Sequence, residues 1–93
     1  MATLHIEHPI TDYATWKGAF DRFAEARGRA GVTSHRIRQP ENDEGFIVVD
    51  LEFEEPQQAH DYLAFLRENV WSSPDNAPAL AGDPVARVLL DRD

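Results

Sequence analysis

The sequence contains no cysteine, and this one absence excludes several kinds of site. A chain without thiols has no disulfide, no thiolate nucleophile, no thiolate zinc site and no iron–sulfur cluster, and it is compatible with the cytosol. Basic residues are also few, 9 against 17 acidic ones, and Lys17 is the only lysine. The net charge of -8 and the scattered arginines would repel phosphate backbones and anionic membranes, so we expect neither nucleic acid nor membrane as a partner.

Long apolar runs are absent as well. No stretch approaches the roughly 20 apolar residues that span a bilayer, and the N-terminal MATLHIEHPI lacks a basic region followed by an apolar one. We therefore expect a cytoplasmic protein. The 93 residues are predicted to form one domain, residues 1–93, whose core is small enough that dimerisation would help to stabilise it.

The stretch GFIVVDLEF, Gly45 to Phe53, is the clearest strand in the chain and informs on both of its faces. One face carries only apolar side chains at a period of two residues, whereas the other mixes apolar and acidic ones. The mixed face consists of Phe46, Val48, Asp50 and Glu52. Such a face suits neither water nor an apolar core, so we expect it to contact another polypeptide.

A second strand, Val32 to Arg38, precedes the turn QPENDEG and is predicted to form an antiparallel hairpin with Gly45 to Phe53. If paired residue numbers sum to 86, Arg36 lies opposite Asp50, which balances charge on the mixed face. A shift by two residues would keep the faces and make that contact diagonal.

Two amphipathic helices flank the hairpin. The first is predicted to run from an Asp12 cap to about Arg29, with Gly28 and Gly31 closing it. Its aromatic stripe is Tyr13, Trp16, Phe20 and Phe23. The second is predicted to begin at Pro56 and to have the apolar stripe Ala59, Tyr62, Leu63, Leu66 and Val70, with His60 and Trp71 at its margin.

The outer segments complete the pattern. Thr3 to Ile6 alternates as a first strand that Pro9 ends, and Val85 to Leu90 forms a fourth. Three prolines between Trp71 and Val85 exclude regular structure there, except for one turn around Ala79 to Ala81. The resulting order, strand, helix, strand, strand, helix, strand, predicts an α+β fold of ferredoxin-like βαββαβ type, a four-stranded antiparallel sheet with two helices on one face.

The residues HPITDYATWKGAFD, His8 to Asp21, and then the hairpin resemble the dimeric α+β barrel superfamily, which includes antibiotic-biosynthesis monooxygenases, muconolactone isomerases and uncharacterised short proteins. This resemblance implies a homodimer whose two sheets close a barrel, and a ligand cavity between each sheet and its helices. On this chain the barrel interior would take His5, Glu7, Ser34, Arg36, Arg38, Val48, Asp50 and Glu52.

Histidines are the candidate catalytic groups. His8 and His35 are the titratable side chains that strand alternation directs towards the helices, and imidazole is the usual acid or base near pH 7. The alternative is that each is bonded to a neighbouring carbonyl. The candidate ligand-pocket residues are Tyr13, Trp16, Phe20, His60, Tyr62 and Trp71, although an aromatic stripe at helical spacing indicates core packing first of all. Arg27, on the apolar face of the first helix, either bonds terminal carbonyls or holds a ligand carboxylate.

No metal or cofactor is expected. The four histidines fall on opposite sheet faces and a helix margin, and no phosphate-binding glycine loop is present. Haem-degrading relatives in the superfamily carry an asparagine on the first strand, which here offers Ile6 and His8 instead. The sequence therefore favours a homodimer that binds a small cyclic organic compound, as a cofactor-free monooxygenase-like or isomerase-like enzyme. The alternative is a non-catalytic ligand-binding or stress-related module.

Overall fold

The computed structural model describes residues 1 to 92 and places the predicted elements in the predicted order. The strands are β1 (Ala2–Pro9), β2 (Ser34–Arg38), β3 (Phe46–Phe53) and β4 (Val85–Leu90). The helices are α1 (Tyr13–Arg22), α2 (Ala24–Ala30) and α3 (Pro56–Phe65), and α3 continues into the π-helical turn η1 (Leu66–Val70). The strands form one antiparallel sheet in the order β2-β3-β1-β4, which is the ferredoxin-like arrangement.

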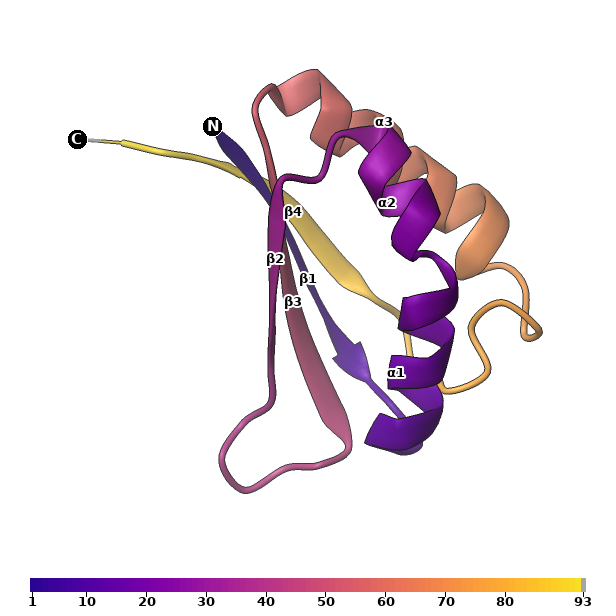
Figure 1. Cartoon of the computed structure of the whole chain (residues 1–93). Helices are drawn as coiled ribbons and strands as arrows, with labels where there is room; N and C mark the ends of the chain where they lie inside the picture. Colours follow the sequence, from indigo (N-terminus) through magenta and orange to yellow (C-terminus); the bar gives the residue numbers. More distant parts are fainter. Residues whose placement is uncertain (93) are drawn as a thin grey trace.

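The molecule has two layers. The helices cover one face of the sheet and leave the other bare (Figure 1). Along β1 and β3, successive side chains alternate between the helix-covered face and the bare face of the sheet. The buried residues on the helix-covered face are Leu4, Ile6, Ile47, Val49, Leu51 and Phe53. These side chains pack against the apolar stripes of the helices and form the core.

The hairpin has the predicted register. Arg36 pairs with Asp50 and Ser34 with Glu52, so paired numbers sum to 86. β1 lies between β3 and β4, where His5 pairs with Asp50 on one side and with Arg87 on the other. Because directly paired residues share a face, the predicted mixed face extends across all four strands.

The prediction of a single first helix is wrong, because the helix breaks at Phe23. The backbone there has φ -99° and ψ 14°, outside helical values. The Phe20 carbonyl oxygen accepts from the Phe23 backbone N–H at 3.2 Å and from Arg27 Nη1 at 2.6 Å. A side chain thus supplies a donor to a carbonyl at the break, and the second half of the helix takes a new direction.

The predicted helix ends are confirmed in part. The Asp12 carboxylate accepts from the Thr15 backbone N–H at 2.8 Å, as expected of an N-cap. Gly31 closes α2 with a positive φ of 98°, whereas Gly28 lies inside α2 and does not close it. Pro56 opens α3, where Glu55 and Gln58 form a capping box.

The segment between η1 and β4 has no helix or strand, as its prolines predict. It is nevertheless anchored to the end of β1, because Ile10 and Leu80 form a β-bridge and the Thr11 backbone N–H donates to Ala79 O at 2.9 Å. This anchoring holds the segment beside the helices. Among the described residues, no helix has the length and apolar character that crossing a membrane requires.

Candidate functional site

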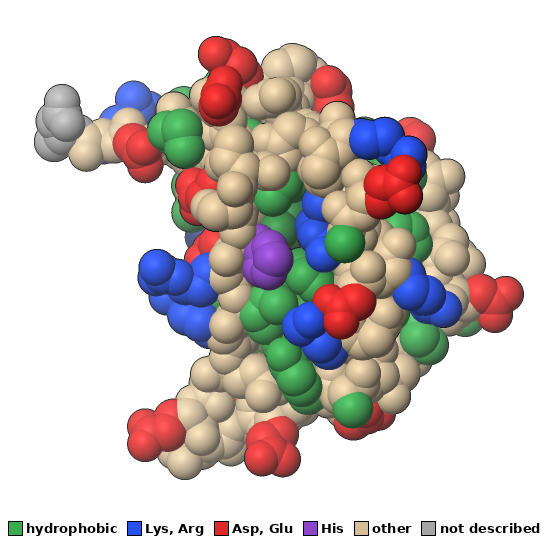
Figure 2. Space-filling model, in the orientation of Figure 1, with side chains coloured by type: hydrophobic (Ala, Val, Ile, Leu, Met, Phe, Trp, Pro, Cys, Tyr) green, Lys and Arg blue, Asp and Glu red, His purple; other side chains and the backbone are tan. Residues whose placement is uncertain are grey.

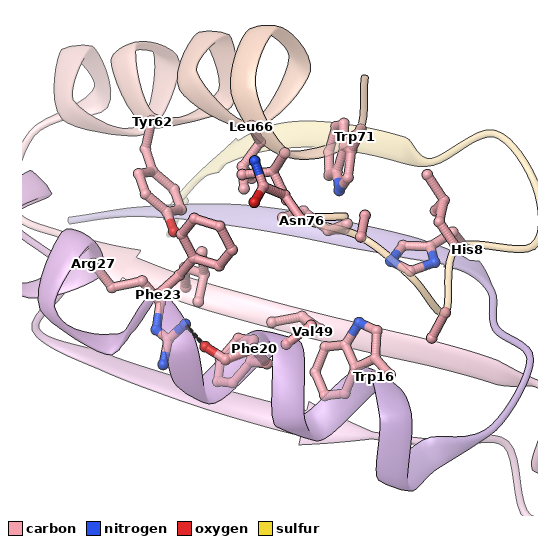
Figure 3. Close-up of a pocket in the computed structure, with 17 residues that line it drawn as sticks. His8, Trp16, Phe20, Phe23, Arg27, Val49, Tyr62, Leu66, Trp71 and Asn76 are labelled. Atoms are coloured by element: carbon pink, nitrogen blue, oxygen red, sulfur yellow. Dashed lines mark hydrogen bonds between the residues drawn. The ribbon is translucent and has the colours of Figure 1, made fainter. Parts of the chain in front are cut away.

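A cavity of about 80 Å³ lies between the sheet and the helices (Figure 3). Its lining residues are Ile6, His8, Trp16, Ala19, Phe20, Phe23, Arg27, Val49, Leu51, Tyr62, Leu66, Val70, Trp71, Asn76, Ala77, Ala79 and Leu80. A dry protein cavity that binds benzene measures about 150 Å³. A ligand with one ring therefore fits only if the wall yields, and the irregular segment after η1 supplies part of that wall.

The cavity is not sealed from solvent. Phe20, Trp71 and Asn76 line it and are each only half-buried. Figure 2 shows hydrophobic side chains in a hollow between the sheet edge and the helices. A small molecule therefore has a route to the interior.

Of the predicted pocket residues, the structure gathers Trp16, Phe20, Tyr62 and Trp71 around the cavity, together with His8. Tyr13 and His60 are not part of its lining. Tyr13 is 40% exposed in the first turn of α1, with its ring centroid 6.1 Å from that of Trp16. His60 is exposed on α3, so the margin of the stripe faces water there.

His35 is on the helix side of the sheet, as predicted, but it does not line the cavity. It pairs with the buried Leu51, yet β2 is an edge strand and the imidazole is exposed. Its ring meets the Phe20 ring edge-on, with centroids 5.3 Å apart. The two candidate catalytic histidines therefore do not meet at one site.

Part of the lining was not predicted from the sequence. Asn76, Ala77, Ala79 and Leu80 come from the irregular segment, where no periodicity indicates which side chains face inwards. The clustering of alanine and proline in SSPDNAPALAGDP was the available signal, because small side chains allow a chain without helix or strand to approach a core closely.

His8 is the titratable group with the clearest chemical state. Its side chain is buried, with 5% exposure, and Nδ1 lies 2.9 Å from the Pro9 carbonyl oxygen. A carbonyl only accepts, so Nδ1 carries the proton and Nε2 of the neutral ring keeps its lone pair. Burial lowers the pKa of His8, and the bond to Pro9 opposes this only in part. The ring is therefore a neutral base at pH 7 on the wall of the cavity.

Other polar atoms line the cavity. In Figure 3 the indole nitrogens of Trp16 and Trp71 turn towards the cavity on the side where His8 lies, and the side chain of Asn76 lies beside Leu66. The amide nitrogen of Asn76 is engaged elsewhere, since it donates to Asn69 O at 2.7 Å. The cavity as a whole thus offers two indole N–H donors and two acceptors, His8 Nε2 and Asn76 Oδ1, to a ligand. Among residues 1 to 92, no three side chains of His, Asp or Glu gather as a metal site.

Arg27 lies at the opposite end of the cavity from His8 (Figure 3). Its side chain is buried, and the guanidinium carbon lies 3.6 Å from the centroid of the Phe20 ring. Burial lowers the pKa of Arg27, and the neighbouring Tyr62 hydroxyl partly offsets this. Burial also raises the pKa of Tyr62, so its phenol stays protonated at pH 7. Both groups are donors in this state.

The bare sheet face carries a charged cluster built on His5. His5 Nδ1 lies 2.6 Å from Asp50 Oδ1, and Nε2 lies 3.1 Å from Glu7 Oε2. Arg38 Nη2 donates to the other oxygen of Asp50 at 2.6 Å. Burial alone would lower the pKa of His5, but the hydrogen bonds and charges of Asp50 and Glu7 outweigh it and raise that pKa. Every residue predicted for the dimer face occupies a strand position on this face; they are His5, Glu7, Arg36, Arg38, Val48, Asp50 and Glu52.

Comparison with known proteins identifies the fold. No protein-family model matches the chain, and no curated protein matches it. Among solved structures, it is similar to SnoaB, a cofactor-independent oxygenase from Streptomyces nogalater, with a TM-score of 0.70 and 14% identity over 99% of this chain and 93% of that one. It is also similar to a monooxygenase from the gene ActVA-Orf6 of Streptomyces coelicolor, in complex with the ligand nanaomycin D. The TM-score is 0.62, and the identity is 19% over 99% of this chain and 88% of that one.

A dimeric ferredoxin-like protein from an uncultured marine organism is also similar, with a TM-score of 0.62 and 10% identity over 100% of this chain and 96% of that one. These identities are low, so the likeness shows the fold alone. The predicted resemblance to antibiotic-biosynthesis monooxygenase-like and dimeric ferredoxin-like proteins is confirmed at that level.

Proposed function

We propose that the protein is a homodimer in which each subunit binds a small cyclic organic compound and moves a proton next to its carbonyl group, with or without dioxygen as a second substrate. The observation that carries this proposal is the state of His8. Its Nδ1–H is held by Pro9 O, which leaves Nε2 as an unprotonated base on the wall of an aromatic cavity.

The isomerase-like version of this chemistry needs only one base. His8 Nε2 accepts a proton from the carbon beside the carbonyl, and the electron pair of that C–H bond delocalises into an enolate. The imidazolium then returns the proton to another carbon of the conjugated system. The N–H groups of Trp16 and Trp71 suit the stabilisation of the enolate oxygen, because they are donors on the same side of the cavity as His8.

The monooxygenase-like version begins with the same proton transfer. The carbanion reduces dioxygen and forms a carbon–oxygen bond. A methylene group then becomes a carbonyl, and the second oxygen atom leaves as water with the two hydrogens. The similarity to a cofactor-independent oxygenase supports this version, and no cofactor is part of the proposal.

The homodimer is supported by the mixed composition of the bare sheet face. Beside the charged cluster around His5, that face exposes apolar side chains, among them Val85 and Leu89. A second copy of the same face would cover these side chains and could pair its charges with those already present. Similar solved structures are described as dimeric ferredoxin-like proteins. A cytoplasmic location belongs to the same proposal and is compatible with the absence of cysteine.

A non-catalytic binding protein is the second candidate. The small cavity and the bond from His8 to a backbone carbonyl favour it, because both also describe a histidine that merely satisfies its hydrogen bonds in a wall. In this version the cavity binds a ligand and no turnover follows.

One experiment tests the proposal with a one-ring substrate. Cyclohex-3-enone conjugates to cyclohex-2-enone when a base moves the proton next to its carbonyl, and ultraviolet absorbance follows the product. A parallel oxygen-electrode assay uses the same substrate, whose methylene next to the carbonyl is the group that the monooxygenase-like version would oxidise with dioxygen. Both tryptophans line the cavity, so quenching of tryptophan fluorescence reports binding in either assay.

We expect turnover by the wild type, a loss of about 100-fold or more in His8→Gln, and little change in His35→Ala, whose imidazole lies outside the cavity. Thermal melts of both variants show whether they are folded. Binding without turnover would support the second candidate, and equal losses in the two variants would contradict the role of His8.

A further inference from the structure

The end of the cavity opposite His8 holds a buried positive charge without an acidic partner. Arg27 is 6% exposed, and no salt bridge among the described residues includes it. Asp21, the acid whose charge acts on Arg27, is itself paired with Lys17. A buried guanidinium normally has a carboxylate or phosphate partner, because removing a charge from water is costly.

The hydrogen bonds of Arg27 within the protein use only part of its donor capacity. Nη1 donates to Phe20 O at 2.6 Å, and one face of the guanidinium covers the Phe20 ring. A guanidinium has five N–H donors arranged in a fork. No side-chain nitrogen or oxygen among residues 1 to 92 is both fully enclosed and without a partner. A nitrogen of Arg27 without a partner in the protein therefore has some accessible surface, and Arg27 lines the cavity.

Tyr62 supplies another donor at the same end. Its phenol oxygen turns towards the side of the cavity where Arg27 lies (Figure 3). Burial raises the pKa of Tyr62, which keeps the hydroxyl proton in place at pH 7. A guanidinium and a phenol side by side can both donate to a carboxylate, and such charge-assisted bonds are stronger than bonds between neutral groups.

We infer that Arg27 and Tyr62 bind the carboxylate of the ligand, so that the compound bound in the cavity is a small cyclic organic acid whose ring extends along the aromatic wall towards His8. This inference rests on the proposed function, since it specifies the ligand of the same cavity. It assigns the two ends different tasks. Arg27 and Tyr62 hold the anionic group, and His8 faces the far side of the ring.

The charge of the protein makes such a site selective. With a net charge of -8, the chain as a whole repels anions. A carboxylate therefore binds favourably only where it contacts a buried cation that has no acidic partner. A neutral analogue of the same shape would leave Arg27 unpaired and bind more weakly.

The test compares benzoate with benzamide, which have nearly the same shape but differ in charge at pH 7. Binding is followed through tryptophan fluorescence and through the indole N–H signals of Trp16 and Trp71 in NMR spectra. The proteins are the wild type, Arg27→Gln, Arg27→Lys, and Arg29→Gln as matched control. Arg29 is on the same helix but is exposed and pairs with Glu25.

We expect the wild type and Arg29→Gln to bind benzoate about tenfold or more tightly than benzamide. Arg27→Gln should bind the two within about twofold, and Arg27→Lys should keep part of the preference because it keeps the charge. Arg27 also holds the break between α1 and α2, so thermal melts accompany each titration. If Arg27→Gln does not fold, the inference is tested by two other results: the preference of the wild type for benzoate over benzamide, and the reduction of that preference in Arg27→Lys.

Equal affinity of the wild type for benzoate and benzamide would overturn the anion site while leaving cavity binding intact. A preference that survives in Arg27→Gln, or disappears in Arg29→Gln, would overturn it too. If neither compound shifts the indole signals, the proposed function fails together with this inference.

Discussion

Nδ1 of His8 donates its proton to the carbonyl oxygen of Pro9, the next residue in the chain, across 2.9 Å. This short-range bond selects the tautomer of a buried imidazole at the end of β1. Pro9 is the last residue of β1, and its carbonyl oxygen also accepts from the Ala81 backbone N–H at 3.2 Å. The base proposed for catalysis is therefore oriented by local sequence.

His8 should make the protein less stable as the pH falls. Its pKa is lowered from 6.5 in the folded state by burial, so the unfolded chain binds a proton that the native state does not. The contribution of His8 to the free energy of unfolding is then complete above the ordinary pKa and is lost as pH falls through the folded value. Urea unfolding of the wild type and of His8→Gln between about pH 7.5 and pH 5 checks this. Identical pH slopes in both proteins would contradict it.

His5 should act in the opposite direction. Asp50 and Glu7 raise its pKa above 6.5, so the native state holds a proton that the unfolded chain releases. The stabilisation is complete below the ordinary pKa and is lost as pH rises through the folded value. Because the cluster is partly exposed, we expect no more than about 1 kcal/mol. Urea unfolding of His5→Gln should show a flatter slope than the wild type above about pH 6.5, and an unchanged slope would count against the ion-pair cluster.

Two adjacent leucines offer a matched test of the dimer. Leu89 and Leu90 in β4 are 45% and 47% exposed, but Leu89 pairs with Thr3 on the bare face and Leu90 pairs with Ala2 on the helix side. We expect sedimentation equilibrium to report about twice the 10.5 kDa chain mass for the wild type and for Leu90→Glu. Leu89→Glu places a charge in the interface and should sediment as a monomer. A monomeric wild type at micromolar concentration would overturn the homodimer.

Two glycines of α2 and its cap should respond oppositely to alanine. Gly28 lies inside the helix, and a Cβ there would meet no atom within 4 Å, so Gly28→Ala should raise the free energy of unfolding by about 0.5–1 kcal/mol. Gly31 has φ 98°, and a Cβ there would lie 2.5 Å from Gln58 Nε2. Gly31→Ala should therefore lower the free energy of unfolding by about 1 kcal/mol or more. Thermal or urea unfolding measures both, and a stabilised Gly31→Ala would contradict the left-handed cap.

The fold was predictable because its signals are local and repeat along the chain. The period of two in Phe46–Phe53, the turn residues before it and the apolar stripe after Pro56 each restrict a segment to one structure. The register of Arg36 against Asp50 was one of two that the sequence left open, because a shift by two residues would have kept the same faces. The break at Phe23 was missed because Arg27 bonds to the Phe20 carbonyl, a contact that helical periodicity does not encode.

The cavity was predictable only in part. Trp16, Phe20 and Tyr62 belong to the stripes that helical spacing assigns to the inner face, and they line the cavity. Trp71 and His60 were both placed at the margin of a stripe, where the angle at which the helix packs decides between water and the interior, and only Trp71 lines the cavity. Tyr13 belongs to a stripe but lies in the first turn of α1, where it is exposed. Asn76 could not be identified, since contacts with distant residues bring its segment to the cavity, among them the bridge between Ile10 and Leu80 and the bond from Arg22 Nη2 to Asp75 O.

By itself the sequence determined the elements, their order and the two faces of the sheet, because alternation and helical spacing are properties of neighbouring residues. Tertiary structure alone decided which of those inward-facing groups share one space. His8 and Arg27 face opposite ends of a single cavity, while His35 is left at an exposed edge, because the sheet order and the path of the irregular segment set which positions are covered. Covering a position depends on contacts between segments distant in the chain, and no local pattern records them.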